Sequence, residues 1–415
     1  MNMDKQEKVI PRGKFAYTYI IFGIIVGIIG TLLQTAFYVK TLYDLPKLLW
    51  IVAAVFVIYG IVQIIKAPSI GTDVVLSPKS AKEFLTNNAI MLALMVLVIV
   101  IMFIEPRFMQ IQVALDILTQ SSVKLIVALG ICFTLLIAGT DLSAGRMVGL
   151  AGVIAGSMLQ TETYANRFFP GLPQLPLFVP ILIAIVVCLL FGTLNGFLVA
   201  KYDMHPFIAT LAVQVIVFGA CSLYFDLPPN NSQPIGGIRP DYQALGQTKL
   251  FAFQIGTFRF DGISVLVPIA MVICAIIWFV LNKTVFGKNV YAIGGNREAA
   301  VVSGVNVFAT IMGIFILAGG LYGIAGVLET ARVAGAGNQY GNGYELDAIA
   351  ACVVGGVSLN GGIGKIGGIL SGVLIFTVIQ YGLQFINVSP MWQQIIKGVI
   401  IAVAVAIDLS KYRRK

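Results

Sequence analysis

The sequence predicts an all-α polytopic membrane protein, and three observations indicate this fold class. Of the 415 residues, 58% are hydrophobic and only 11% are charged, whereas a soluble domain carries about 25% charged residues. The mean hydropathy is +0.94. Apolar runs of about 20 residues, the length that crosses the hydrocarbon core as a helix, recur between polar breaks. A soluble enzyme, a disordered regulator and a secreted disulfide-rich domain are therefore excluded.

These runs define twelve candidate membrane spans. Two of them, 147–160 and 346–358, are too short to cross comfortably. They are either short full spans or broken, re-entrant helices that border a cavity. The twelve runs are 17–39, 48–65, 89–104, 123–139, 147–160, 177–200, 207–224, 263–281, 308–330, 346–358, 365–386 and 391–409.

The distribution of positive charge predicts the orientation of these spans. When the N-terminus is placed inside, the inner segments hold seventeen Lys and Arg residues and the outer segments hold eight. Cytoplasmic loops carry an excess of Lys and Arg. Both termini are therefore expected in the cytoplasm, with the net charge of +9 acting as an orientation signal and not as a nucleic-acid site.

Small residues predict a tightly packed bundle. The chain has 44 glycines, and several recur four residues apart, which places them on one helix face. The five cysteines lie singly in apolar runs and are expected to be small buried packing residues. The glycine pairs are Gly23/Gly27, Gly152/Gly156, Gly192/Gly196, Gly319/Gly323 and the series Gly364/Gly368/Gly372.

Charged residues within the spans are few. Lys124, Glu329, Lys397 and Asp408 lie near the ends of the predicted helices, where side chains can reach the interface. This scarcity argues against a carrier driven by protons or sodium. Uncharged polar residues lie deeper, and they either contact the hydroxyls of a neutral solute or bond helix to helix. The candidates for a translocation path are Asn195, Thr210, Gln214, Thr377 and Gln380.

Motifs of soluble catalysis do not fit this chain. The sequence 362–367 matches GxGxxG, but it lacks the acidic residue about 20 positions later and is flanked by membrane segments. The sequence contains no GxxxxGK[ST], so a P-loop for ATP is excluded. Asp141 is interpreted as a helix N-cap. A single histidine, His205, and dispersed cysteines predict no metal site and no resident cofactor.

The inner segment 282–307 predicts a short, structured helix. Asn296 is a favourable N-cap, Glu298 falls in the first turn, and Gly294-Gly295 is expected to form a flexible break. Small residues on such a helix suit docking into a cleft of a cytoplasmic partner, with a plain interfacial loop as the alternative. The candidate coupling residues are Gly294, Gly295, Asn296, Arg297, Glu298, Ala299, Ala300, Ser303 and Gly304.

Three segments resemble a known family. The sequences 141–146, 286–307 and 344–358 are similar, in order and spacing, to the permease subunits of bacterial sugar ABC importers of the ribose/galactose type. The likeness runs from about residue 84 to the C-terminus, four fifths of the chain. The segments 120–123, 141–149 and 351–358 and the ending 392–398 most resemble the galactose/methyl-galactoside branch.

This resemblance implies a core of about ten helices over 84–415, related to vitamin B12-type importers, and leaves 1–83 as an extension with two further predicted helices. It implies four partners: a second permease copy, a cytoplasmic sugar-type ABC ATPase that binds the ATP, an extracytoplasmic sugar-binding protein and a monosaccharide. The helix around Asn296 would then couple to the ATPase. The alternatives are a secondary carrier for a neutral polar solute and a passive channel or scaffold.

Overall fold

The computed structural model describes residues 8–10, 20–21, 23–28, 74–76, 100–102, 104–255 and 258–412. These residues divide into two compact units, Met1–Asp116 with Ile379–Pro390, and Ile117–Val378 with Met391–Lys415. The predicted span 48–65, and most of the predicted spans 17–39 and 89–104, lie outside the described residues.

The first unit contains a short ribbon and the ends of two long helices. Strand β1 (Lys8–Ile10) pairs with β2 (Val74–Leu76) in antiparallel fashion. The short helix η2 (Pro106–Met109) precedes α5 (Ile111–Leu136), and α15 (Ile366–Phe385) ends in the same unit. The ring of Phe108 lies 6.4 Å from that of Tyr381 and 5.6 Å from that of Phe385. Aromatic packing therefore joins the start of α5 to the end of α15.

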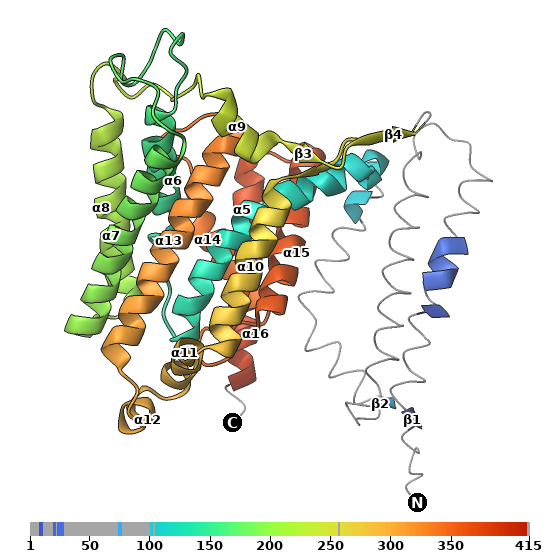
Figure 1. The fold of residues 1–415 in the computed structure, drawn as a ribbon. Coiled ribbons are helices and arrows are strands. Elements are labelled where there is room, and N and C mark those ends of the chain that lie inside the picture. Colours follow the sequence, from blue (N-terminus) through green and yellow to red (C-terminus); the bar gives the residue numbers. More distant parts are fainter. Residues whose placement is uncertain are drawn as a thin grey trace, which may run out of the picture. The chain divides into compact units, whose positions relative to one another are not determined.

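The second unit is a helical bundle (Figure 1). Six helices of the described chain are long and apolar enough to cross a membrane, namely α5, α7, α8, α10, α13 and α15. This confirms a polytopic membrane protein. Besides α5 and α15, the helices are α6 (Ala144–Met158), α7 (Phe178–Tyr202), α8 (Pro206–Phe225), α9 (Pro240–Gln247), α10 (Leu266–Lys283), α11 (Val285–Gly295), α12 (Arg297–Val302), α13 (Val307–Val333), α14 (Tyr344–Val354) and α16 (Pro390–Tyr412).

The two short candidate spans contain short helices. Helix α6 has 15 residues and α14 has 11. Their N-terminal turns meet, because a methyl group on Gly145 of α6 would lie against Gly341 and the carboxylate of Glu345.

Close helix packing follows the predicted glycine pairs. Two thirds (67%) of the apolar window of α13 is buried, compared with 28% for α7, α8 and α10, so α13 is central. Gly192 of α7 lies against Phe315 and Gly319 of α13, and Gly323 lies against Ile185. The five cysteines are all buried and free, as predicted. Because a Cβ atom at these glycines would meet the neighbouring helix, the small residues set the distance between α7 and α13.

The long segment between α8 and α10 forms a lobe at one end of the bundle, opposite α11 and α12 (Figure 1). It contains α9 and two antiparallel ribbons. Strand β3 (Lys249–Leu250) pairs with β6 (Ile263–Ser264), and β4 (Phe253–Ile255) pairs with β5 (Phe258–Phe260) with Gln254 opposite Arg259. Within the second unit, the strands are thus confined to one loop of a helical fold.

Candidate functional site

The predicted coupling segment forms two short helices, α11 and α12, at the end of the bundle where α16 also ends (Figure 1). Asn296 caps α12, since its Oδ1 atom accepts a hydrogen bond from the Ala299 backbone N–H at 2.9 Å. Glu298 lies in the first turn, Ser303 is the C-cap, and Gly304 follows with a φ of +83°. The short helix predicted from these residues is confirmed.

The expected flexible break at Gly294-Gly295 is wrong. Both residues belong to the last turn of α11, and Gly294 lies against backbone atoms of Leu136 and Gly362. The Gly362 N–H donates to the Leu136 carbonyl at 2.8 Å. Gly295, in contrast, faces open space. Glycine is therefore required at Gly294 by close backbone packing, which fixes α11 to the end of α5 and to the turn before α15.

Helix α12 presents apolar side chains outward. Val302 is 89% exposed and Val301 is 56% exposed, whereas Ala300 is buried. Arg297 forms an exposed ion pair with Asp203, which lies in the turn between α7 and α8. An exposed apolar tip on a capped helix is typical of a surface that a protein partner covers.

Two of the predicted path residues, Asn195 and Thr210, lie around the irregular segment before α6. Asn195 Nδ2 donates to Ser143 Oγ at 2.8 Å, and the Ser143 hydroxyl and N–H donate to Asp141 Oδ1 at 2.6 and 2.9 Å. The Leu142 N–H donates to Thr210 Oγ1 at 3.1 Å. Asp141 therefore braces the turn before the helix, while Ser143 occupies the N-cap position where we had expected Asp141.

The other three path candidates lie elsewhere. Gln214 is half-buried on α8. Thr377 on α15 is fully buried and lines a small cavity with Lys124 and Asp347. Gln380 is buried on the same helix but belongs to the first compact unit. The structure thus brings Asn195 and Thr210 together and places Thr377 in a second polar site.

Charged residues near the ends of the predicted spans are paired within the protein, Lys397 with Asp347 across helices and Glu329 with Arg332 within α13. Lys397 Nζ lies 3.1 Å from Asp347 Oδ1, and Asp347 is only 7% exposed. Glu329 accepts from Arg332 at 2.7 and 2.9 Å and from the Tyr344 hydroxyl at 2.8 Å. The side chain of Asp408 lies outside the described residues.

Sequence reasoning missed Asp347 as the partner of Lys397 because the two residues are 50 positions apart in the chain. Glu345 and Asp347 open a short apolar run, and this acidic start was the one available signal. Both are buried, as is Asp141. Among the residues that the structure describes, no group of three or more His, Cys, Asp or Glu side chains is placed to hold a metal ion.

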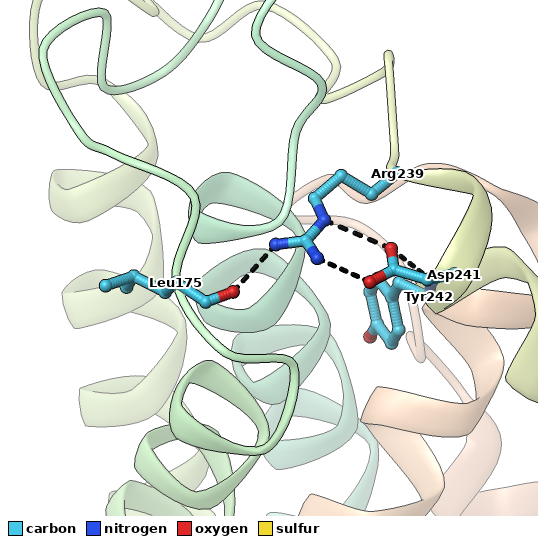
Figure 2. Close-up of polar contacts among 4 residues, drawn as sticks. All are labelled: Leu175, Arg239, Asp241 and Tyr242. Atoms are coloured by element: carbon cyan, nitrogen blue, oxygen red, sulfur yellow. Dashed lines mark hydrogen bonds and ion pairs between the residues drawn. The ribbon is translucent and has the colours of Figure 1, made fainter.

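The lobe opposite α12 is anchored by polar contacts (Figure 2). Arg239 Nη1 donates to the Leu175 carbonyl at 2.7 Å, and Arg239 Nε donates to Asp241 Oδ1 at 3.0 Å. The Tyr242 hydroxyl donates to the Val327 carbonyl of α13 at 2.8 Å. Burial raises the pKa of Tyr242, so this hydroxyl stays protonated. These contacts hold α9 and the segment before α7 against the central helix.

The bundle of apolar helices, with its capped helix at one end, is the fold of a multi-pass membrane protein. Residues 113–405 match the family described as "Branched-chain amino acid transport system / permease component". The chain belongs to this family.

Its relatives are named as import permeases, not as enzymes. The galactose/methyl galactoside import permease protein MglC of Haemophilus influenzae is 46% identical over 333 residues, 80% of this chain and 97% of that protein. The protein of the same name from Escherichia coli is 46% identical over 82% of this chain and 99% of its own length. The ribose import permease protein RbsC of Haemophilus influenzae is 37% identical over 79% and 94%. No solved structure matches the chain significantly. The family resemblance predicted from the sequence is confirmed.

Proposed function

We propose that this chain is the transmembrane permease subunit of an ATP-driven importer for a monosaccharide, with galactose or methyl galactoside as the first candidate substrate. One observation carries the proposal. The relatives named as galactose/methyl galactoside permeases are 46% identical over nearly their whole length, whereas the ribose permease of the same organism is 37% identical. A secondary carrier becomes the weaker alternative, because the family and its relatives are import permeases.

The importer takes its energy from a separate cytoplasmic ATPase of the sugar type, which binds the ATP. A second copy of this permease and an extracytoplasmic sugar-binding protein complete it. The coupling segment runs from Gly294 to Gly304, with α12 seated in the ATPase. The exposed Val301 and Val302 and the Asn296 cap support this role, since they give a rigid helix an apolar contact surface.

The remaining assignments concern topology. The end of the bundle that carries α12 faces the cytoplasm, together with both chain termini, in keeping with Lys283, Lys288 and Arg297 in that region. Residues 84–415 form the ten-helix core related to vitamin B12-type importers, and 1–83 form an extension with two helices. Asn195, Thr210, Gln214, Thr377 and Gln380 contribute to the translocation path.

Reconstituted transport tests the proposal. The permease is placed in liposomes with its ATPase enclosed and its binding protein outside, and uptake of labelled galactose is measured. Uptake should need ATP and both partners, and should survive dissipation of ion gradients. Uptake that follows an ion gradient without the ATPase would replace the proposal with a secondary carrier.

A double substitution in α12 tests its assignment as the coupling helix. Glu298→Lys combined with Ala299→Trp changes the charge and size of the docking surface of α12. The variant should insert normally into membranes but should not import sugar. Wild-type uptake by this variant would refute the role of α12.

A further inference from the structure

A small enclosed cavity lies between α5, α14 and α15. It leaves about 10 Å³ for the centre of a water molecule and is lined by Lys124, Tyr344, Asp347, Phe376 and Thr377, with apolar side chains completing the wall. A cavity of roughly this size is at the lower limit for one water molecule. A monosaccharide does not fit unless the surrounding helices separate.

The Thr377 hydroxyl is the feature that the packing of the bundle leaves unexplained. Thr377 is fully buried, and its Oγ1 atom has no hydrogen-bond partner in the protein. Buried hydroxyls on these helices usually donate to the carbonyl four residues earlier, as Ser121 and Ser122 do on α5 at 2.7 and 2.8 Å. Ser371, on the same helix as Thr377, does so at 3.0 Å. An unsatisfied buried hydroxyl is costly, so a ligand in the cavity is expected.

The charges around the cavity define the chemistry of that ligand. Lys124 contributes an ammonium group, which only donates, and Asp347 contributes a carboxylate, which accepts. Asp347 is also paired with Lys397 at 3.1 Å. A cation would meet two lysines, and an anion would meet a carboxylate. A neutral group that both donates and accepts, as a hydroxyl does, matches all three side chains.

The aromatic residues of the wall add a second requirement. Phe376 and Tyr344 line the same cavity. Apolar ring faces suit the C–H face of a sugar, while the polar side chains suit its hydroxyls. The combination is that of a carbohydrate contact, reduced here to the size of one oxygen atom.

We propose that Lys124, Asp347 and Thr377 form a hydroxyl-binding site in the permease, occupied by water when the cavity is closed and by one hydroxyl of the sugar during transport. Binding of a sugar hydroxyl in this site rests on the proposed import function. Binding of water there does not depend on that function. The site gives the permease its own part in selecting the sugar, in addition to that of the binding protein.

Two variants of Thr377 test the site. Thr377→Val keeps the shape and removes the hydroxyl, whereas Thr377→Ser keeps the hydroxyl. In the reconstituted importer, Thr377→Val should lower galactose uptake by about 5- to 10-fold, the loss expected for one hydrogen bond between neutral hydroxyls. Thr377→Ser should stay within about twofold of the parent. Parental uptake by Thr377→Val would overturn the proposal.

Deoxygalactoses, each lacking one hydroxyl, show whether a sugar hydroxyl or only water occupies the site. If the sugar occupies the site, the parent will discriminate against one deoxygalactose and Thr377→Val will not. If water alone occupies it, Thr377→Val will slow every sugar by the same factor.

Thermal unfolding in detergent tests the site without transport, and so separates its failure from failure of the import function. If the Thr377 hydroxyl is hydrogen-bonded to a ligand in the cavity, the melting temperature of Thr377→Val should equal or lie below that of the parent. A clear rise in the melting temperature would mean that the hydroxyl was simply unsatisfied, and would overturn the proposal even if galactose import were confirmed.

Discussion

Removing the cap of α12 should weaken the contact with the ATPase. The Asn296 side chain satisfies the Ala299 N–H at 2.9 Å, and α12 has only six residues. Replacing an Asn N-cap with Ala costs about 1 kcal/mol. A helix this short has little other stability of its own. Because about 1 kcal/mol corresponds to about a fivefold change in an equilibrium constant, Asn296→Ala should lower the folding equilibrium of α12 about fivefold, and the apparent affinity for the ATPase by up to about fivefold.

The chain supplies a matched control for this change. Asn306 caps α13 with the same geometry, its Oδ1 atom accepting from the Ala309 N–H at 2.9 Å. Helix α13 has 27 residues and lies at the centre of the bundle, so Asn306→Ala should cost similar stability without unfolding the helix. Asn306→Ala should therefore bind the ATPase as the parent does.

The assay is titration of the detergent-solubilised permease with its ATPase, read as a dissociation constant. Asn296→Ser, which retains a good capping side chain, should bind within about twofold of the parent. The capping argument is refuted if Asn296→Ala binds like the parent, or if Asn296→Ser is as weak as Asn296→Ala, since the latter would indicate a direct contact of the amide with the partner.

Three further changes test the packing of the bundle. Gly294→Ala should destabilise the permease by about 1–3 kcal/mol, because its methyl group meets backbone atoms, whereas Gly295→Ala should leave the stability unchanged. Equal melting temperatures of the two variants would contradict this expectation. Lys397→Met removes a cation 3.1 Å from Asp347 and should lower the stability of the fold by about 1–3 kcal/mol. Adding Asp347→Asn should restore part of that stability. An unchanged stability of Lys397→Met would mean that the ion pair does not stabilise the fold. Arg239→Ala should speed protease cleavage of the loop before α7, and an unchanged rate would show that this loop is held by other contacts.

Local patterns predicted the helices and the coupling segment well. Apolar runs gave the spans of α7, α8, α10 and α13 within a few residues, because a membrane helix must satisfy its own backbone. Asn296 and Gly304 marked the ends of α12, since capping depends on residues close together in the chain.

Long-range contacts limited what the sequence could predict. Lys397 and Asp347 are 50 positions apart, and from the sequence Lys397 is an isolated charge near a helix end. Gly294 looked like a flexible break, although its role is set by Leu136, far earlier in the chain. The five path candidates were chosen by polarity and depth alone, and neither property indicates which of them meet in space.

The junction of Gly294, Leu136 and Gly362 has a mechanical consequence. Its contacts join main chain to main chain, so side-chain rotamers cannot absorb a displacement there. A push on α12 that reaches α11 must move the end of α5 and the turn before α15 by nearly the same amount. Those two helices carry Lys124 and Thr377. The junction is therefore expected to transmit a displacement of α11 rigidly to α5 and α15. The size of that displacement should depend on the backbone geometry and should change little when the surrounding side chains are exchanged.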